Sequence, residues 1–291
     1  MTARCLRRWA AVVGLLLTCA APAQAVSPGA KHAQDPKRTG LPYESVTFPS
    51  TRDSVELNGW WFDQPTGAPV VVICSRGHGT MADLLPSVRE LAQRGMAVLT
   101  FDYRDFGPGT PGPSDSLAQV IFASRWVNDA EGALRFARRK APGRLVFVWG
   151  QDLGSAVAVA AASRAKSNAD GVACEGLFRT AQEQIRWNGT SQDVEVQRRH
   201  RRLVDGSDEP VSSVPMLQVP LWVVYAGKDE VTPPNVTRDV TRYNLSVIER
   251  WSLPAAGHDG VELTPGYFDR LVKWIRSIAA VLAPPATASG R

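Results

Sequence analysis

The sequence alternates short apolar runs with longer stretches of helical period, and this alternation restricts the fold. Runs rich in β-branched residues predict strands at 45–48, 57–62, 69–74, 96–101, 145–149, 171–174, 221–226 and 247–253. Apolar residues at helical spacing predict helices at 84–94, 126–140, 155–166 and 267–282. Strands that alternate with helices form a mostly parallel, doubly wound sheet, here eight-stranded, with helices on both faces. Ligands bind such sheets at the carboxyl ends of the strands.

The first 25 residues have the pattern of a secretory signal peptide. Three arginines precede an apolar stretch at 10–21 that is too short to span a bilayer, and Ala23–Ala25 has the pattern of a cleavage site. We therefore expect a secreted or periplasmic protein that begins at Val26, without stable membrane insertion. A retained N-terminal anchor and lipid attachment at Cys19 are the less favoured alternatives.

The charge of the chain gives little reason to expect an anionic partner. The sequence has 33 Lys and Arg against 28 Asp and Glu, but residues 1–25 hold three of the Arg and no acid. Without them 30 basic residues face 28 acidic ones, a formal charge of +2. No basic stripe interleaved with aromatic residues indicates nucleic acid. The basic run Arg198–Arg202 is compatible with an anionic ligand, although a solvated helix face explains it equally simply.

The sequence also predicts no metal and no cofactor. The four His are too scattered for a zinc site, and the chain has no glycine-rich phosphate loop. Residues 26–43 are polar and predict a disordered leader, and residues 283–291 a disordered tail. Between them, 44–282 predicts one α/β domain, in which about 175–218 forms a short, lid-like insert.

Three chemically capable residues follow the ends of predicted strands. Asp152 lies in the stretch Gly150-Gln151-Asp152-Leu153-Gly154, where glycines on both sides allow a sharp turn from strand to helix. Asp229 and His258 follow the next strands along the chain. A carboxylate beside an imidazole can hold its tautomer, so that the imidazole serves as a base. Each residue alone also has an ordinary interpretation, Asp152 as a helix N-cap and His258 as a solvated loop residue.

These motifs make the chain resemble the α/β-hydrolase superfamily, in particular its compact serine-hydrolase branch with little or no lid. The resemblance covers about residues 44–282. It rests on Phe101-Asp102-Tyr103-Arg104, the stretch from Gly150 to Gly154, Gly227-Lys228-Asp229-Glu230 with Pro233-Pro234, and Gly257-His258. The resemblance implies that Asp229 is the triad acid and His258 the triad base. It also implies that the backbone N–H of Leu153 and one near Gly77 hold an oxyanion.

The chain departs from the family pattern around the nucleophile. Asp152 occupies the place of the family's serine, and Ser75-Arg76 stands where the family has His-Gly after the third strand. A His-Gly pair follows at His78-Gly79, and Asp105 replaces the glycine that often follows the Phe101–Arg104 motif. Arg76 is predicted either to face Asp152 and lower its pKa, or to turn outward.

An aspartate at this position also occurs in dehalogenases and epoxide hydrolases that resemble this chain. There the carboxylate attacks carbon to form an ester, and the histidine activates the water that hydrolyses it. We therefore expect an exported hydrolase that acts on an ester, an epoxide or a carbon–halogen bond of a small organic substrate through Asp152, His258 and Asp229. The alternative is an inactive hydrolase fold that binds a ligand or partner, because Leu153 and the short insert differ from those enzymes.

Two cysteines remain after residues 1–25, Cys74 and Cys174. In the strand order that the resemblance implies, the elbow strand separates their two strands. Two strand spacings are about 10 Å, beyond the roughly 7 Å between Cα atoms that a disulfide spans. We therefore predict two free, buried thiols.

Overall fold

The structure of the chain is a computed structural model that describes residues 26–65, 67–108, 120–164, 168–187, 194–242 and 244–282. The predicted signal peptide at 1–25 and the predicted tail at 283–291 lie outside the described residues. In the described part, no helix combines the length and the apolar character needed to cross a membrane.

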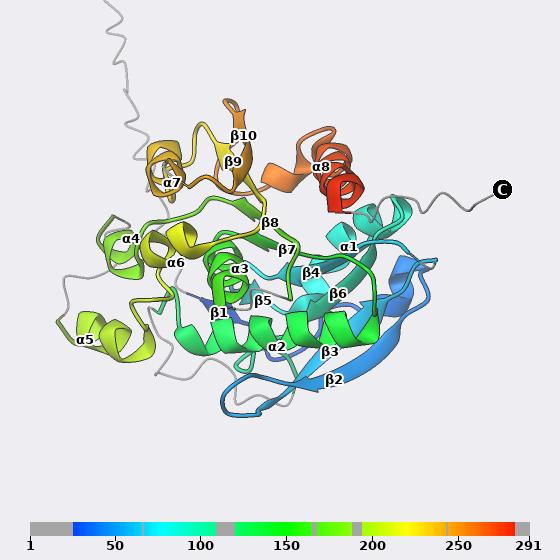
Figure 1. The fold of residues 1–291 in the computed structure, drawn as a ribbon. Helices are drawn as coiled ribbons and strands as arrows, with labels where there is room; N and C mark the ends of the chain where they lie inside the picture. Colours follow the sequence, from blue (N-terminus) through cyan, green and yellow to red (C-terminus); the bar gives the residue numbers. More distant parts are fainter. Residues whose placement is uncertain are drawn as a thin grey trace, which may run out of the picture.

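The core of the fold is an eight-stranded sheet in the order β10-β9-β8-β7-β4-β6-β3-β2 (Figure 1). The strands are β2 (Glu44–Pro49), β3 (Glu56–Phe62), β4 (Val70–Cys74), β6 (Ala97–Phe101), β7 (Val146–Gln151), β8 (Gly171–Glu175), β9 (Leu221–Ala226) and β10 (Val247–Leu253). The β2–β3 and β3–β6 pairs are antiparallel, and all other neighbours in this sheet are parallel. The predicted mostly parallel, eight-stranded sheet is therefore confirmed.

Helices cover both faces of the sheet. Alternate residues of β4 point to opposite sides, so Val70 and Val72 pack with α2 and α3, whereas Val71 and Ile73 pack with α1 and α8. The helices are α1 (Leu85–Gln93), α2 (Ser124–Lys140), α3 (Leu153–Arg164), α4 (Ala181–Trp187), α5 (Val194–Leu203), α6 (Pro210–Met216), α7 (Pro234–Thr241) and α8 (Tyr267–Leu282). The four helices predicted from apolar spacing are present as α1, α2, α3 and α8, and α5 contains the Arg198–Arg202 run that was interpreted as a helix face. The short helices α4, α6 and α7 were not predicted.

Residues 26–43 are ordered, so the prediction of a disordered leader is wrong. β1 (Ser27–Pro28) pairs in parallel with β5 (His78–Gly79), and the short helix η1 (Pro36–Thr39) follows. His32 Nε2 lies 2.7 Å from Asp102 Oδ2, directly after β6. The segment is polar because its partners are backbone and carboxylate groups of distant loops, and composition alone does not reveal such partners.

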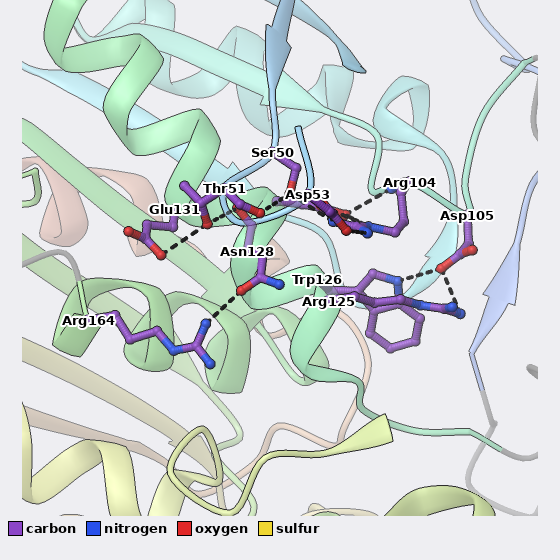
Figure 2. A network of polar contacts seen from close by, with 11 residues as sticks. Ser50, Thr51, Asp53, Arg104, Asp105, Arg125, Trp126, Asn128, Glu131 and Arg164 are labelled. Carbon is purple, nitrogen blue, oxygen red and sulfur yellow. Dashed lines mark hydrogen bonds and ion pairs between the residues drawn. The ribbon is translucent and has the colours of Figure 1, made fainter. Parts of the chain in front are cut away.

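A polar network joins the turn after β2, the residues after β6 and helix α2 (Figure 2). Arg104 donates to Asp129 at 2.7 Å, to Asp53 at 3.1 Å and to Ser50 Oγ at 2.8 Å. Burial alone would lower the pKa of Arg104, but these hydrogen bonds to carboxylates outweigh it and raise the pKa. The network fixes the chain directly after β6.

Asp105, at the position where the superfamily often has glycine, belongs to the edge of the same network. Its Oδ2 accepts a hydrogen bond from Trp126 Nε1 at 3.0 Å and pairs with Arg125 at 2.9 Å (Figure 2). Both partners lie at the start of α2. The aspartate thus ties the loop after β6 to the beginning of that helix.

The two cysteines lie as predicted. Cys74 of β4 and Cys174 of β8 both stand in register with Gly150 of β7, one on each side. Both thiols are free and buried. Burial raises the pKa of Cys74 to about 12 and that of Cys174 further still, so neither thiol is a nucleophile near neutral pH.

Candidate active site

The turn between β7 and α3 presents Asp152 at the carboxyl edge of the sheet. Asp152 has a φ of 51°, in the left-handed region that non-glycine residues seldom adopt. A Cβ on Gly150 would lie 2.1 Å from the Gly154 carbonyl oxygen, and one on Gly154 would lie 2.2 Å from the Cys74 carbonyl oxygen. Only glycine fits at either place. The strained central residue therefore has the geometry of a nucleophile elbow.

The structure brings together the three residues predicted for the site. His258 Nδ1 lies 3.1 Å from both carboxylate oxygens of Asp229, and His258 Nε2 lies 3.4 Å from Asp152 Oδ2. Asp229 is buried, and its Oδ1 accepts the backbone N–H of Val231 at 2.9 Å and of Thr232 at 2.8 Å. The imidazole thus lies between one rigid, buried carboxylate and one carboxylate at the elbow.

This arrangement makes His258 a cation at neutral pH. Burial lowers its pKa, but the hydrogen bonds and charges of Asp152 and Asp229 outweigh burial and raise the pKa to about 10. An imidazolium donates a proton and cannot accept one. Since part of the rise comes from Asp152, loss of the Asp152 charge would lower the pKa and restore a base.

The predicted oxyanion side of the site lies against Leu153. A Cβ on Gly77, whose φ is 91°, would lie 2.7 Å from Leu153 Cδ2, so the two residues are in contact. Within the described ranges, the backbone N–H groups of Gly77 and Leu153 donate to no protein acceptor. Ser75 is buried, and its carbonyl oxygen accepts a hydrogen bond from Tyr103 at 3.3 Å. Two N–H groups are thus available beside the elbow.

Of the two alternatives predicted for Arg76, the ion pair with Asp152 is wrong. The Arg76 guanidinium lies 3.0 Å from Glu262 and 3.5 Å from Asp259. Both carboxylates belong to the loop that follows His258, and they hold the guanidinium.

The shifted His78-Gly79 pair forms β5 and is paired with β1 of the leader. His78 is half-buried, and burial lowers its pKa despite the nearby Asp152 carboxylate. The pair therefore holds the leader beside the Gly77 turn and carries a neutral imidazole.

A cavity of about 20 Å³ lies directly beside Asp152. It is large enough for one water molecule, which needs about 10–15 Å³ and two to four polar partners. The cavity is lined by Arg76, Gln151, Asp152, Glu175, Gly176, Ala226, Asp229, His258 and Val261. Glu175 and Gln151 were not predicted as site residues, although an acidic residue at the end of an apolar strand run is a usable signal.

The segment predicted as a lid-like insert carries α4, α5 and α6, with residues 188–193 outside the described ranges. Arg198, Arg201 and Arg202 are exposed on α5, whereas His200 is buried and its Nε2 accepts the backbone N–H of Ile121 at 3.2 Å. A lid role for the segment and an anionic ligand at Arg198–Arg202 stay predictions. In the described part of the chain, no three His, Cys, Asp or Glu side chains are grouped to hold a metal ion.

Comparison with known proteins agrees with the elbow and the sheet. Residues 66–192 match the family described as serine aminopeptidase, S33. An esterase of Pyrococcus furiosus has a similar structure, with a TM-score of 0.68 at 17% identity, over 87% of this chain and 96% of that one. These matches support one conclusion, that the chain has the α/β-hydrolase fold.

Three further proteins match this chain over most of its length. An uncharacterised protein of Mycobacterium tuberculosis is 24% identical over 78% of this chain and 76% of its own. The protein bem46 of Schizosaccharomyces pombe is 23% identical over 82% of this chain and 79% of its own. A 2,6-dihydroxy-pseudo-oxynicotine hydrolase has a TM-score of 0.64 at 15% identity, over 83% and 69% of the two chains.

Proposed function

We propose that this α/β-hydrolase is an exported enzyme that hydrolyses a small organic substrate with Asp152 as nucleophile, His258 as base and Asp229 as the residue that orients His258. One observation carries the proposal. A carboxylate occupies the strained apex of the elbow, with His258 Nε2 at 3.4 Å and Asp229 behind the imidazole.

The first step is attack by Asp152 on a substrate carbon. A carboxylate oxygen forms a bond to that carbon, the bond to the leaving group breaks, and an ester of Asp152 results. The negative charge of Asp152 leaves with the departing group. The side chain of Asp152 is 25% exposed, so the substrate approaches from the solvent side.

The second step uses the change in charge that the first step produces. Once Asp152 is esterified, His258 keeps only the Asp229 carboxylate, so its pKa falls and its Nε2 loses a proton to solvent. The neutral imidazole then accepts a proton from the water that attacks the ester. In this proposal, the N–H groups of Leu153 and Gly77 stabilise the oxyanion that forms, and the contact between the two residues supports it.

The chemistry of a carboxylate nucleophile favours certain substrates. Attack on a carbon–halogen bond or an epoxide gives an ordinary ester, which water can hydrolyse. Attack on a carboxylic ester would give an anhydride, a harder route. A carbon–halogen bond or an epoxide is therefore the preferred substrate class, with esters third.

A second candidate function is an inactive fold that binds a ligand or partner. The cavity beside Asp152 measures about 20 Å³, which accommodates water but no organic molecule. Arg76, a cation beside the elbow, is paired with Glu262 and Asp259. A site with room for water alone favours a fold without turnover that binds its ligand or partner elsewhere on its surface.

Turnover assays separate the two functions. The chain from Val26 onward and its Asp152→Asn variant are assayed with chloroacetate, styrene oxide and para-nitrophenyl acetate. The enzyme proposal predicts turnover by the wild type that Asp152→Asn abolishes. Wild-type protein that turns over none of the three supports the inactive fold, and equal turnover by both proteins excludes Asp152 as the nucleophile.

The Asp152→Ser variant tests the oxyanion groups separately. If the N–H groups of Leu153 and Gly77 are placed for an oxyanion, this variant gains esterase activity toward para-nitrophenyl acetate. If the variant stays inactive while remaining folded, the altered loop at Ser75-Arg76 does not support acyl transfer.

The proposed export rests on the pattern of residues 1–25. Expression of the full chain in a Gram-negative host is expected to give periplasmic protein whose N-terminal residue is Val26. Cytoplasmic protein that retains residues 1–25 would contradict export, and a membrane fraction carrying lipid on Cys19 would favour the lipoprotein alternative.

A further inference from the structure

Glu175 is the last residue of β8, and its carboxyl group is buried within the candidate active site. The side chain lines the same small cavity as Asp152, His258 and Asp229. Its Oε1 accepts hydrogen bonds from the Tyr267 hydroxyl and from Trp149 Nε1, the latter at 3.2 Å. The other oxygen, Oε2, accepts a hydrogen bond from Gln151 Nε2 at 3.3 Å. Three uncharged donors thus hold the carboxyl group in one orientation.

The backbone of Glu175 fixes this carboxyl group relative to the elbow. Its carbonyl oxygen accepts the N–H of Asp152 at 2.9 Å and the hydroxyl of Ser155 at 2.6 Å. Its own N–H donates to Ser155 Oγ at 2.9 Å. These hydrogen bonds join the backbone of Glu175 directly to the elbow.

Burying the Glu175 carboxyl group costs free energy, and packing alone does not account for its presence in the interior. Burial raises the pKa of Glu175 to about 7, although Tyr267 and Gln151 lower it, and an apolar side chain in the same place would avoid that cost. The charged groups that influence it are Arg76 and Glu262, and the cavity adds Asp152, His258 and Asp229. One hydrogen bond from a protein donor to Oε2 is present, from Gln151, and a carboxylate oxygen can accept a second.

We propose that Glu175 is a further catalytic residue, whose Oε2 accepts a hydrogen bond from a water molecule in the cavity and holds that water for attack on esterified Asp152. This inference rests on the proposed function and deepens it. The cavity has the volume of one water molecule, and its walls supply the two to four polar partners that such a water needs.

Hydrolysis of the Asp152 ester by this water conserves atoms and charge. The water oxygen bonds to the carboxyl carbon of Asp152 while one water proton moves to His258 Nε2. The bond from that carbon to the ester oxygen, which Asp152 supplied in the first step, then breaks, and this oxygen takes the proton from His258 and leaves with the substrate carbon as an alcohol. The acid form of Asp152 returns its remaining proton to His258, which restores the carboxylate and the imidazolium.

Following the covalent adduct by rapid quenching and mass spectrometry tests this role. Full-length mature protein is mixed with chloroacetate or styrene oxide, and formation and loss of the adduct on Asp152 are timed separately. In the Glu175→Gln variant, the adduct is expected to form at the wild-type rate and to disappear about a hundredfold more slowly. The adduct therefore accumulates in the variant alone.

Glu209→Gln is the matched control. Glu209 is a half-buried carboxyl group whose pKa burial likewise raises to about 7, but it accepts the backbone N–H of Ala181 at the start of α4 and does not line the cavity. This variant is expected to lose the adduct at the wild-type rate. Equal slowing in both variants would show a general effect of removing a buried carboxyl group and would overturn the role of Glu175.

Tyr267→Phe provides a second variant that keeps the Glu175 carboxyl group and removes one of its donors. It is expected to slow loss of the adduct about tenfold while thermal unfolding shows a folded protein. If the wild type forms no adduct, the proposed function fails and the role of Glu175 fails with it. If the wild type forms an adduct that Glu175→Gln and Tyr267→Phe both clear at the wild-type rate, the role of Glu175 alone is overturned.

Discussion

Arg104 and His258 each lie between two carboxylates, yet only the network around His258 can do chemistry. In each, one carboxylate is buried and the other reaches solvent. Arg104 lies in the network of Figure 2, and His258 in the candidate active site. For Arg104 the buried partner is Asp129, whose side chain is 0% exposed, and the other is Asp53, at 44%. For His258 the buried partner is Asp229, at 3%, and the other is Asp152, at 25%.

The difference between the networks lies in the cation. A guanidinium keeps its proton in proteins, so Arg104 fixes the chain after β6 permanently. An imidazolium whose pKa depends on a neighbouring carboxylate changes state when that carboxylate changes charge. The same charge arrangement is thus a permanent ion-pair cross-link around Arg104 and an acid–base pair that can change its protonation state around His258.

The largest effect is expected from breaking the Arg104 network at its buried carboxylate. Asp129→Asn leaves Arg104 without its buried counter-charge and is expected to lower the free energy of unfolding by about 3 kcal/mol. Urea unfolding of the variant and the wild type measures this. If the free energy of unfolding falls by no more than loss of an exposed ion pair costs, the network does not cross-link the fold as described.

The next effect concerns the proton on His258. Asp152→Asn removes one of the two carboxylates that raise the pKa of His258, so the pKa is expected to fall from about 10 by about 1 to 3 pH units. Titration of the imidazole by nuclear magnetic resonance reports this directly. An unchanged pKa would mean that Asp152 and His258 are not coupled.

A related effect appears in the pH dependence of stability. The pKa of folded His258 lies above its ordinary value of 6.5, so the stabilisation from its ion pairs is fully present below pH 6.5 and is lost as the pH rises toward 10. The stability difference between wild type and Asp152→Asn should therefore shrink over that range. Urea unfolding at several pH values between 6.5 and 10 measures this difference. A difference in the free energy of unfolding that stays constant over the range would contradict the role of Asp152 in raising the pKa of His258.

The smallest effect is expected at the exposed end of the Arg104 network. Asp53→Asn removes a carboxylate that water already screens, so the free energy of unfolding should fall by less than about 1 kcal/mol. The same urea experiment measures this loss. A loss comparable to that of Asp129→Asn would mean that both carboxylates, and not the buried one alone, hold the chain after β6.

Much of the fold and of the triad could be predicted because both depend on local patterns. Continuous apolar runs identify strands buried on two faces, and strand order follows from the superfamily. The elbow is visible because only glycine fits at positions 150 and 154. Asp229 and His258 could be placed together because they follow neighbouring strands at one edge of the sheet.

The predictions that failed depend on contacts between distant residues. The leader is ordered because Ser27 and His32 find partners after β4 and β6, and nothing in residues 26–43 indicates them. Arg76 had several carboxylates within reach, and only the geometry selects Glu262 and Asp259. The sequence does not indicate Glu175 as a site residue, because its proposed role depends on the side chains that surround it.

The central claim is that Asp152 attacks the substrate and becomes the ester that water hydrolyses. A single turnover in water labelled with heavy oxygen tests it most directly, with enzyme in excess over chloroacetate. Hydrolysis at the carboxyl carbon of Asp152 leaves the labelled oxygen in Asp152, and the alcohol product carries an unlabelled oxygen from the protein. Labelled product and an unlabelled Asp152 would show that water attacks the substrate itself, and would contradict the account.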